Sequence, residues 1–221
     1  IPYSERGAYS DFLSVKGRYF VENDDKQKFY SRWGDLNTII FAIPELIRGP
    51  GTAEYSTDSL IYHNIFNIIL ACILAIYLIR IGVMLGADRW HALLFVLCTF
   101  YGTFLWNYLR AQTYEIYQLS FFVAFFYHFM QFVRSPKKHS HFTAAQILLG
   151  VLVLCKSYFA LLYFPTAWFV WQMYTRKTIA IRTITYNVLT AMVVVAVHLY
   201  LIYYKFGVFK LTGEGASLDD S

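Results

Sequence analysis

The chain has 221 residues, of which 57% are hydrophobic, 20% aromatic and only 15% charged, with a formal net charge of +5. About a quarter of the residues of a soluble domain are charged, so this composition excludes a soluble globular protein. It predicts an all-α fold, a polytopic transmembrane helical bundle with an outer-face loop that carries an interfacial amphipathic helix. The cations lie in short loops between apolar tracts, where membrane topology accounts for them, so we expect no nucleic-acid partner.

Residues 1–59 are polar and aromatic, and no segment within them is apolar enough to span a membrane. Apolar residues recur there at helical spacing, namely Leu36, Ile39, Ile40, Ile43, Leu46 and Ile47. This spacing predicts a short amphipathic helix over 36–48 that lies in the membrane interface, with Asn37 on its polar side. A helix packed on a soluble lobe is the alternative.

Apolar runs dominate the rest of the chain, over 60–205. The runs long enough to cross a bilayer core of about 30 Å as single helices are about 60–85, 90–109, 114–133 and 183–204. Residues 206–221 begin another polar loop. The chain starts without Met and stops without a closing element, so we interpret it as a fragment of a longer protein with at least one span upstream.

A further apolar stretch, 142–174, is interrupted only by Lys156. As one helix it would be about 50 Å long, far more than the bilayer core. The loops on both sides of it are basic, and basic loops stay in the cytoplasm. The stretch is therefore predicted to cross twice, as a short hairpin with arms over 142–156 and 158–174.

The same rule orients the whole chain. The loops near Arg89, Lys137 and Arg176 are predicted to be cytoplasmic. Residues 1–59, the turn between Arg110 and Glu115, the Lys156 turn and the tail then share the opposite face.

The turn at 106–117 joins two predicted spans and places Arg110 and Glu115 within reach of each other, with aromatic residues around them. A cation and a carboxylate at the mouth of a helical hairpin can bind a charged substrate. An interfacial ion pair with aromatic anchors is the alternative interpretation.

Three segments together resemble the GT-C superfamily of membrane glycosyltransferases. They are residues 102–110 (GTFLWNYLR) leading to Glu115, residues 30–34 (YSRWG) leading into the amphipathic segment, and the polar Lys156-Ser157 turn of a short hairpin. The nearest branch is the bacterial family-39-like proteins, relatives of protein O-mannosyltransferases and of the lipid A aminoarabinose transferase. The chain departs from that pattern in one place. Where such enzymes carry an Asp just after their first span, it has Glu5, with Asp11 six residues later.

The resemblance implies transfer of a sugar from a polyprenyl-phosphate donor to an acceptor on the outer face. It assigns Glu5 or Asp11 as the catalytic base and Arg110 and Lys156 as partners of the lipid phosphate. It further implies that Glu115 orients Arg110, and that Arg32 and Asp35 line the cleft. The sequence specifies no cofactor and leaves open whether a divalent metal takes part.

Two other classes remain open. If neither Glu5 nor Asp11 replaces the missing acid, the chain is a non-catalytic relative or an integral subunit of a larger membrane complex. A transporter is the third class, disfavoured because the ionisable residues of the spans lie near their ends. In each case the expected partners are membrane lipids, and the expected location is the bacterial cytoplasmic membrane with 1–59 on the non-cytoplasmic side.

Overall fold

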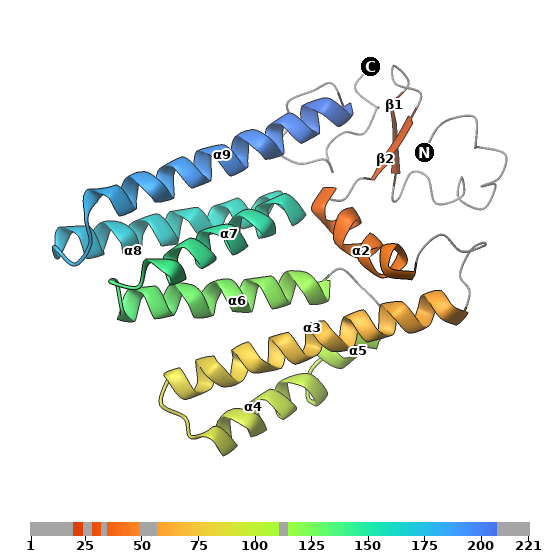
Figure 1. The fold of residues 1–221 in the computed structure, drawn as a ribbon, viewed down its shortest axis with the longest axis horizontal. Coiled ribbons are helices and arrows are strands. Elements are labelled where there is room, and N and C mark those ends of the chain that lie inside the picture. Colours follow the sequence, from red (N-terminus) through yellow and green to blue (C-terminus); the bar gives the residue numbers. More distant parts are fainter. Residues whose placement is uncertain (1–19, 24–27, 32–34, 49–56, 111–114, 207–221) are drawn as a thin grey trace.

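The computed structural model describes residues 20–23, 28–31, 35–48, 57–110 and 115–206 (Figure 1). Its strands are β1 (Phe20–Asn23) and β2 (Lys28–Ser31). Its helices are α2 (Asp35–Arg48), α3 (Thr57–Met84), α4 (Arg89–Tyr101), α5 (Leu105–Arg110), α6 (Glu115–Arg134), α7 (His139–Cys155), the 3₁₀ helix η2 (Ser157–Leu162), α8 (Tyr163–Thr175) and α9 (Ile181–Phe206).

The described residues are helical apart from turns and one small antiparallel hairpin. In that hairpin β1 pairs with β2, so that Phe20 faces Ser31 and Asn23 faces Lys28. The all-α prediction therefore holds for the bulk of the fold and missed these two short strands. Val21 and Tyr30, which pair across the hairpin, are residue types that favour strands.

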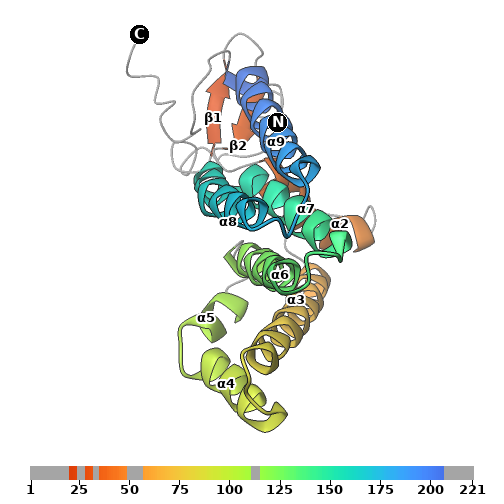
Figure 2. The same cartoon turned by 90° about the vertical axis from the view of Figure 1, so that its left-hand side faces the viewer.

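Helix α6 has a central position and runs antiparallel to α7 but parallel to α3, and α8 runs antiparallel to α9 (Figures 1 and 2). Helix α6 packs on α3 on one side and on α7 on the other, α4 covers α3, and α9 packs on α7 and α8. The first half of α6 contributes Ile116 and Tyr117 to one apolar core, and its second half contributes Phe125 and Phe132 to another. Helix α6 can pack on helices on both sides because its own apolar residues are distributed around nearly the whole helix.

Within the described part of the chain, three helical segments are long and apolar enough to cross a membrane. They are Ile61–Met84, Glu115–Arg134 and Ile181–Tyr204. The sequence placed spans at about 60–85, 114–133 and 183–204, close to these bounds. The stretch 142–174 is divided into α7 and the η2–α8 arm, with the change of direction at Lys156.

The predicted single helix over 90–109 is wrong. Helix α4 ends at Tyr101, and α5 begins at Leu105 after a short break. At Gly102 a Cβ atom would lie 2.6 Å from the Cys98 carbonyl oxygen, so a residue with a side chain does not fit this backbone. The Thr103 hydroxyl donates to the Thr99 carbonyl oxygen and also accepts from the Leu105 amide, which places it between the two helices.

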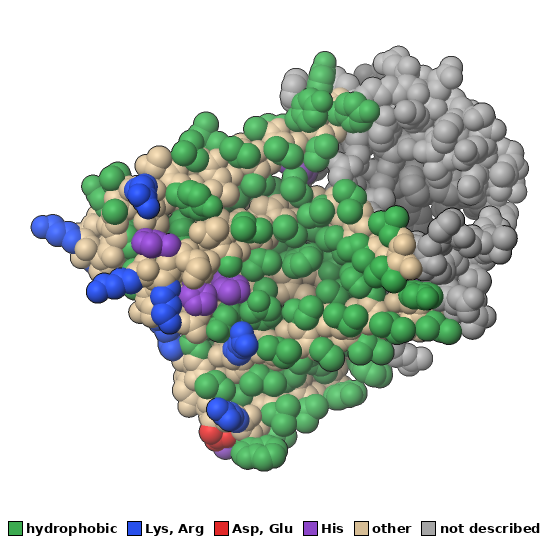
Figure 3. Space-filling view, viewed as in Figure 1, with side chains coloured by type: hydrophobic (Ala, Val, Ile, Leu, Met, Phe, Trp, Pro, Cys, Tyr) green, Lys and Arg blue, Asp and Glu red, His purple; other side chains and the backbone are tan. Residues whose placement is uncertain are grey.

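The charged side chains are separated from the apolar surface. Figure 3 shows Lys and Arg gathered at the end of the bundle where the α3–α4, α6–α7 and α8–α9 loops lie, while hydrophobic side chains cover most of the surface beyond it. We call this end the basic end. Helix α2, the start of α6 and the end of α7 lie at the opposite end (Figure 1).

Candidate functional site

The end of the bundle opposite the basic end brings together α2, α6 and α7, which are far apart in the sequence. Asn37 of α2 is the residue that joins them. Its side-chain amide donates to the Cys155 carbonyl oxygen at 2.8 Å, and its side-chain oxygen accepts from Gln118 Nε2 at 3.0 Å. The Tyr117 hydroxyl donates to the Asn37 backbone oxygen at 3.2 Å. These contacts fix the position of α2 relative to the first turn of α6 and the last turn of α7.

This junction corrects the sequence interpretation of α2. Asn37 was predicted on the polar side of the helix, but its side chain is buried, with only 3% of its surface exposed. Ile40 is buried beside it, whereas Ile39 and Ile47 are exposed on the other side of the helix. The helix therefore turns a polar residue toward the bundle and leaves apolar residues outside, where lipid can cover them.

Glu115 begins α6 and lies at this junction, two residues before Tyr117. Its Oε2 atom is buried and has no hydrogen-bond partner among the described residues. A carboxylate in the first turn of a helix is stabilised by the helix dipole, but a buried carboxylate oxygen also requires a donor or a cation. Arg110, the predicted cation, is the last residue of α5, and its side chain lies outside the described atoms.

Helix α5 is held near this site by a contact from α3. Asn67 Nδ2 donates to the Leu109 carbonyl oxygen at 3.1 Å, and Asn67 is buried. An Asn in a membrane helix commonly bonds to a neighbouring helix in this way. The contact fixes the backbone position next to Arg110, and α5 also packs against α6.

Lys156 connects α7 to η2 in an extended conformation, and its backbone amide donates to the Leu152 carbonyl oxygen. Its side chain is half-buried, with the ammonium nitrogen 5.4 Å from the centre of the Tyr158 ring. It directly follows Cys155, whose carbonyl oxygen accepts from Asn37. Asn37 thus bonds to Cys155, the residue before Lys156, and to Gln118, three residues after Glu115.

An apolar groove begins next to Lys156. Its volume is about 710 Å³, and it lies between η2–α8 and α9, with Ser157, Leu161, Phe164, Met192, Val195 and Leu199 among its lining residues. Almost all of the lining is apolar, so the groove suits a hydrocarbon chain. A chain in this groove would have one end beside the Lys156 turn.

The remaining predicted site residues lie outside what the structure describes. Glu5, Asp11 and Arg32 belong to undescribed segments, and Asp35 begins α2 with its side chain undescribed. In the described residues no group of three or more His, Cys, Asp or Glu side chains could hold a metal ion. The junction residues Asn37 and Gln118 were not predicted, because the sequence signal for each is a single polar residue in a helical apolar pattern.

Comparison with protein-family models, with curated proteins and with solved structures gave no match.

Proposed function

We propose that the chain is the membrane part of a glycosyltransferase that moves a sugar from a polyprenyl-phosphate donor to an acceptor on the outer face. The proposal starts from the resemblance of residues 102–110, 30–34 and the Lys156 turn to GT-C enzymes. The observation that supports it best is that α2 is bonded both to the first turn of α6, where Glu115 lies, and to Cys155, which Lys156 follows, while the lining of an apolar groove begins at Ser157.

In this proposal the acceptor hydroxyl loses its proton to Glu5 or Asp11 and attacks the anomeric carbon of the sugar. The bond from that carbon to the phosphate oxygen breaks, and the polyprenyl phosphate leaves with the bonding electrons. Lys156 and Arg110 offset the charge that develops on the phosphate, and Glu115 orients Arg110. Arg32 and Asp35 line the cleft.

In this proposal the polyprenyl chain of the donor lies in the groove between η2–α8 and α9. We infer that the phosphate at the head of the chain then lies near Ser157, which lines the groove and directly follows Lys156. The arrangement requires an integral membrane protein, and three helical segments are long and apolar enough to cross a membrane. We place the chain in the bacterial cytoplasmic membrane, with residues 1–59 on the non-cytoplasmic side.

The test is a sugar-transfer assay on the full-length protein with polyprenyl-phosphate sugars. Removing the base, by Glu5→Gln or Asp11→Asn, should cost roughly 10²–10⁴ in rate while donor binding remains. Arg110→Lys should also cause a large loss, because a point charge does not reproduce the two parallel hydrogen bonds of a guanidinium. Lys138→Gln, at the basic end, is the matched control and should keep full activity. If the three site variants all keep full activity, the proposed site is wrong.

The second candidate is a non-catalytic integral subunit of a larger membrane complex. It is favoured by the departure from the acid motif, because the chain carries Glu5 where such enzymes carry an Asp. Absence of transfer with every lipid-linked sugar, together with recovery of the full-length protein in a stable complex, would favour this candidate over the enzyme.

A further inference from the structure

A second cavity lies at the basic end of the bundle, far from the junction of α2, α6 and α7. It is formed between α3, α4 and α6 and has a volume of about 620 Å³. Each of the three helices contributes one arginine to its lining, Arg80, Arg89 and Arg134. Tyr127 and Gln131 add two further polar side chains, and the rest of the lining is apolar.

The three arginines have no carboxylate partner among the described residues, where the only ion pair is between Asp88 and His91. The Asp88 carboxylate is already used, because it caps α4 by accepting from the amides of Trp90 at 2.8 Å and His91 at 3.0 Å. These bonds, first of all the one from the His91 amide, lower the pKa of Asp88 and keep it ionised at the helix end. The lining of the cavity holds three arginines and no carboxylate, so the cavity carries a net positive charge.

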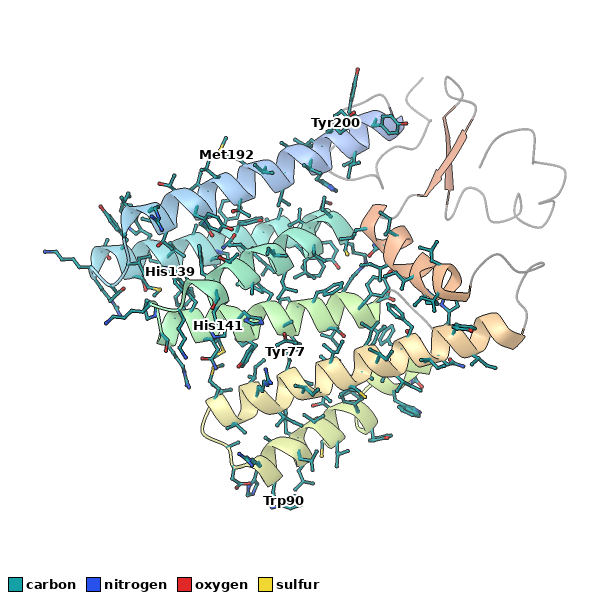
Figure 4. All side chains as sticks on the ribbon, in the orientation of Figure 1. Tyr77, Trp90, His139, His141, Met192 and Tyr200 are labelled. Carbon is teal, nitrogen blue, oxygen red and sulfur yellow. The ribbon has the colours of Figure 1, made fainter. Side chains whose placement is uncertain are left out.

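The arginine on α3 is positioned by aromatic residues instead of an acid. The guanidinium carbon of Arg80 lies 5.9 Å from the centre of the Tyr127 ring, a distance at which a cation is attracted to a ring face. The Tyr127 hydroxyl accepts from Gln131 Nε2 at 3.3 Å, and its ring packs against Tyr77 at 5.4 Å. Figure 4 shows Tyr77 between α3 and α6. A guanidinium held this way keeps its donors available for an anion.

The basic cavity continues into an apolar groove. This groove, of about 590 Å³, lies between α3 and the α4–α5 segment and shares two lining residues with the cavity, Ile79 and Leu93. Small side chains on α3, such as Ala71 and Ala75, leave the space open, and the lining is mostly apolar. A ligand that fills both has a charged head and a long apolar tail.

We propose that this combined site binds an anionic phospholipid, with its phosphate among Arg80, Arg89 and Arg134 and an acyl chain in the groove between α3 and α4–α5. Arginine suits a phosphate because its planar fork donates parallel hydrogen bonds to two oxygens. A basic pocket between membrane helices is suited to anionic headgroups. A zwitterionic lipid should bind more weakly, because the three arginines repel the cation of its headgroup. The inference rests on membrane insertion of α3 and α6 and not on glycosyl transfer.

The test is lipid binding by the purified full chain in mild detergent, read by native mass spectrometry. The probes are dioleoylphosphatidylglycerol, dioleoylphosphatidylcholine and glycerophosphoglycerol, which is the same headgroup without chains. We expect the anionic lipid to bind at least roughly tenfold more tightly than either of the others. Arg80→Gln, Arg89→Gln and Arg134→Gln should each weaken binding of the anionic lipid by a similar factor. Lys137→Gln and Lys177→Gln remove the same charge at the same end but outside the cavity, and should leave binding nearly unchanged.

Three results would overturn the proposal. Equal binding of the zwitterionic lipid removes the role of the arginines, and equal binding of glycerophosphoglycerol reduces the site to a free-phosphate pocket. Equal weakening by the lysine variants means general attraction by a basic surface. Thermal unfolding of each variant establishes that it is folded. Because the three arginines are tested separately, the proposal can still be tested with two variants if the third does not fold.

Discussion

At the residue scale, Asn37 does more to fix the relative positions of the helices than any charged residue that the structure describes. It is a buried polar side chain with both ends of its amide bonded, one to the backbone of α7 and one to a side chain of α6. A buried polar group that is bonded at both ends favours one arrangement of the helices around it, because an alternative leaves some of its atoms without partners. The candidate site depends on this arrangement.

We expect Asn37→Leu to lower the free energy of unfolding by roughly 1–3 kcal/mol, since it leaves Gln118 Nε2 and the Cys155 carbonyl oxygen buried without their partner. The measurement is unfolding of the full chain in mixed detergent micelles. Asn107→Leu, at an exposed position, is the matched control and should change stability little. Equal stability of the two variants would mean that the junction does not hold α2 in place.

The role of Asn37 could not be predicted from the sequence, for a physical reason. Helical periodicity separates apolar from polar positions, and it assigns a polar residue to the solvent side by default. The buried position of Asn37 is stabilised by its bond to the Cys155 carbonyl oxygen at the end of α7, 118 residues away in the sequence. No local sequence pattern encodes the position of that oxygen. Glu115 and Lys156 were predicted as site residues because a charge between long apolar runs is conspicuous in the sequence itself.

At the element scale, the lengths of the apolar runs predicted most of the long helices, and the break in the second run was missed. Hydropathy is continuous from Trp90 to Leu109, so it contains no signal for an interruption. The break depends on the backbone at Gly102, where a Cβ would collide with the Cys98 carbonyl oxygen. It also depends on the Thr103 hydroxyl. The sequence feature that could have indicated the break is the Gly102-Thr103 pair within the apolar run.

We expect Gly102→Ala to lower the free energy of unfolding by roughly 1–3 kcal/mol, because the added Cβ meets a backbone atom that cannot move independently. Gly82→Ala is the comparison variant. There the added Cβ would lie 3.0 Å from the Ala92 side chain, on a neighbouring helix that can shift slightly, so the loss should be smaller. The reverse order of the two losses, measured by the same unfolding experiment, would show that the break does not depend on the glycine.

At the scale of the whole molecule, the separation of charge gives the bundle two different ends. The loops with Arg89, Lys137 and Arg176 lie together at one end, and the Asn37 junction lies at the other. Antiparallel packing of α6 with α7 and of α8 with α9 produces this grouping, because each successive basic loop returns to the same end. In a membrane, the basic end is expected to face the cytoplasm.

This orientation is tested by cysteine accessibility in membranes, on a chain whose three native cysteines are replaced by serine. We expect Ser140→Cys, in the first turn of α7, and Thr178→Cys, in the α8–α9 loop, to be labelled from the cytoplasmic side. Tyr158→Cys, beside the Lys156 turn, is the comparison position and should be labelled from the opposite side. Both the hairpin of α7 with η2–α8 and the placement of the candidate glycosyltransferase site on the outer face depend on this pattern. Labelling of positions 140 and 178 from opposite sides would contradict the hairpin. Labelling of both from the outside would invert the chain, and would place the anionic-lipid cavity in the outer leaflet and the Glu115–Lys156 junction in the cytoplasm.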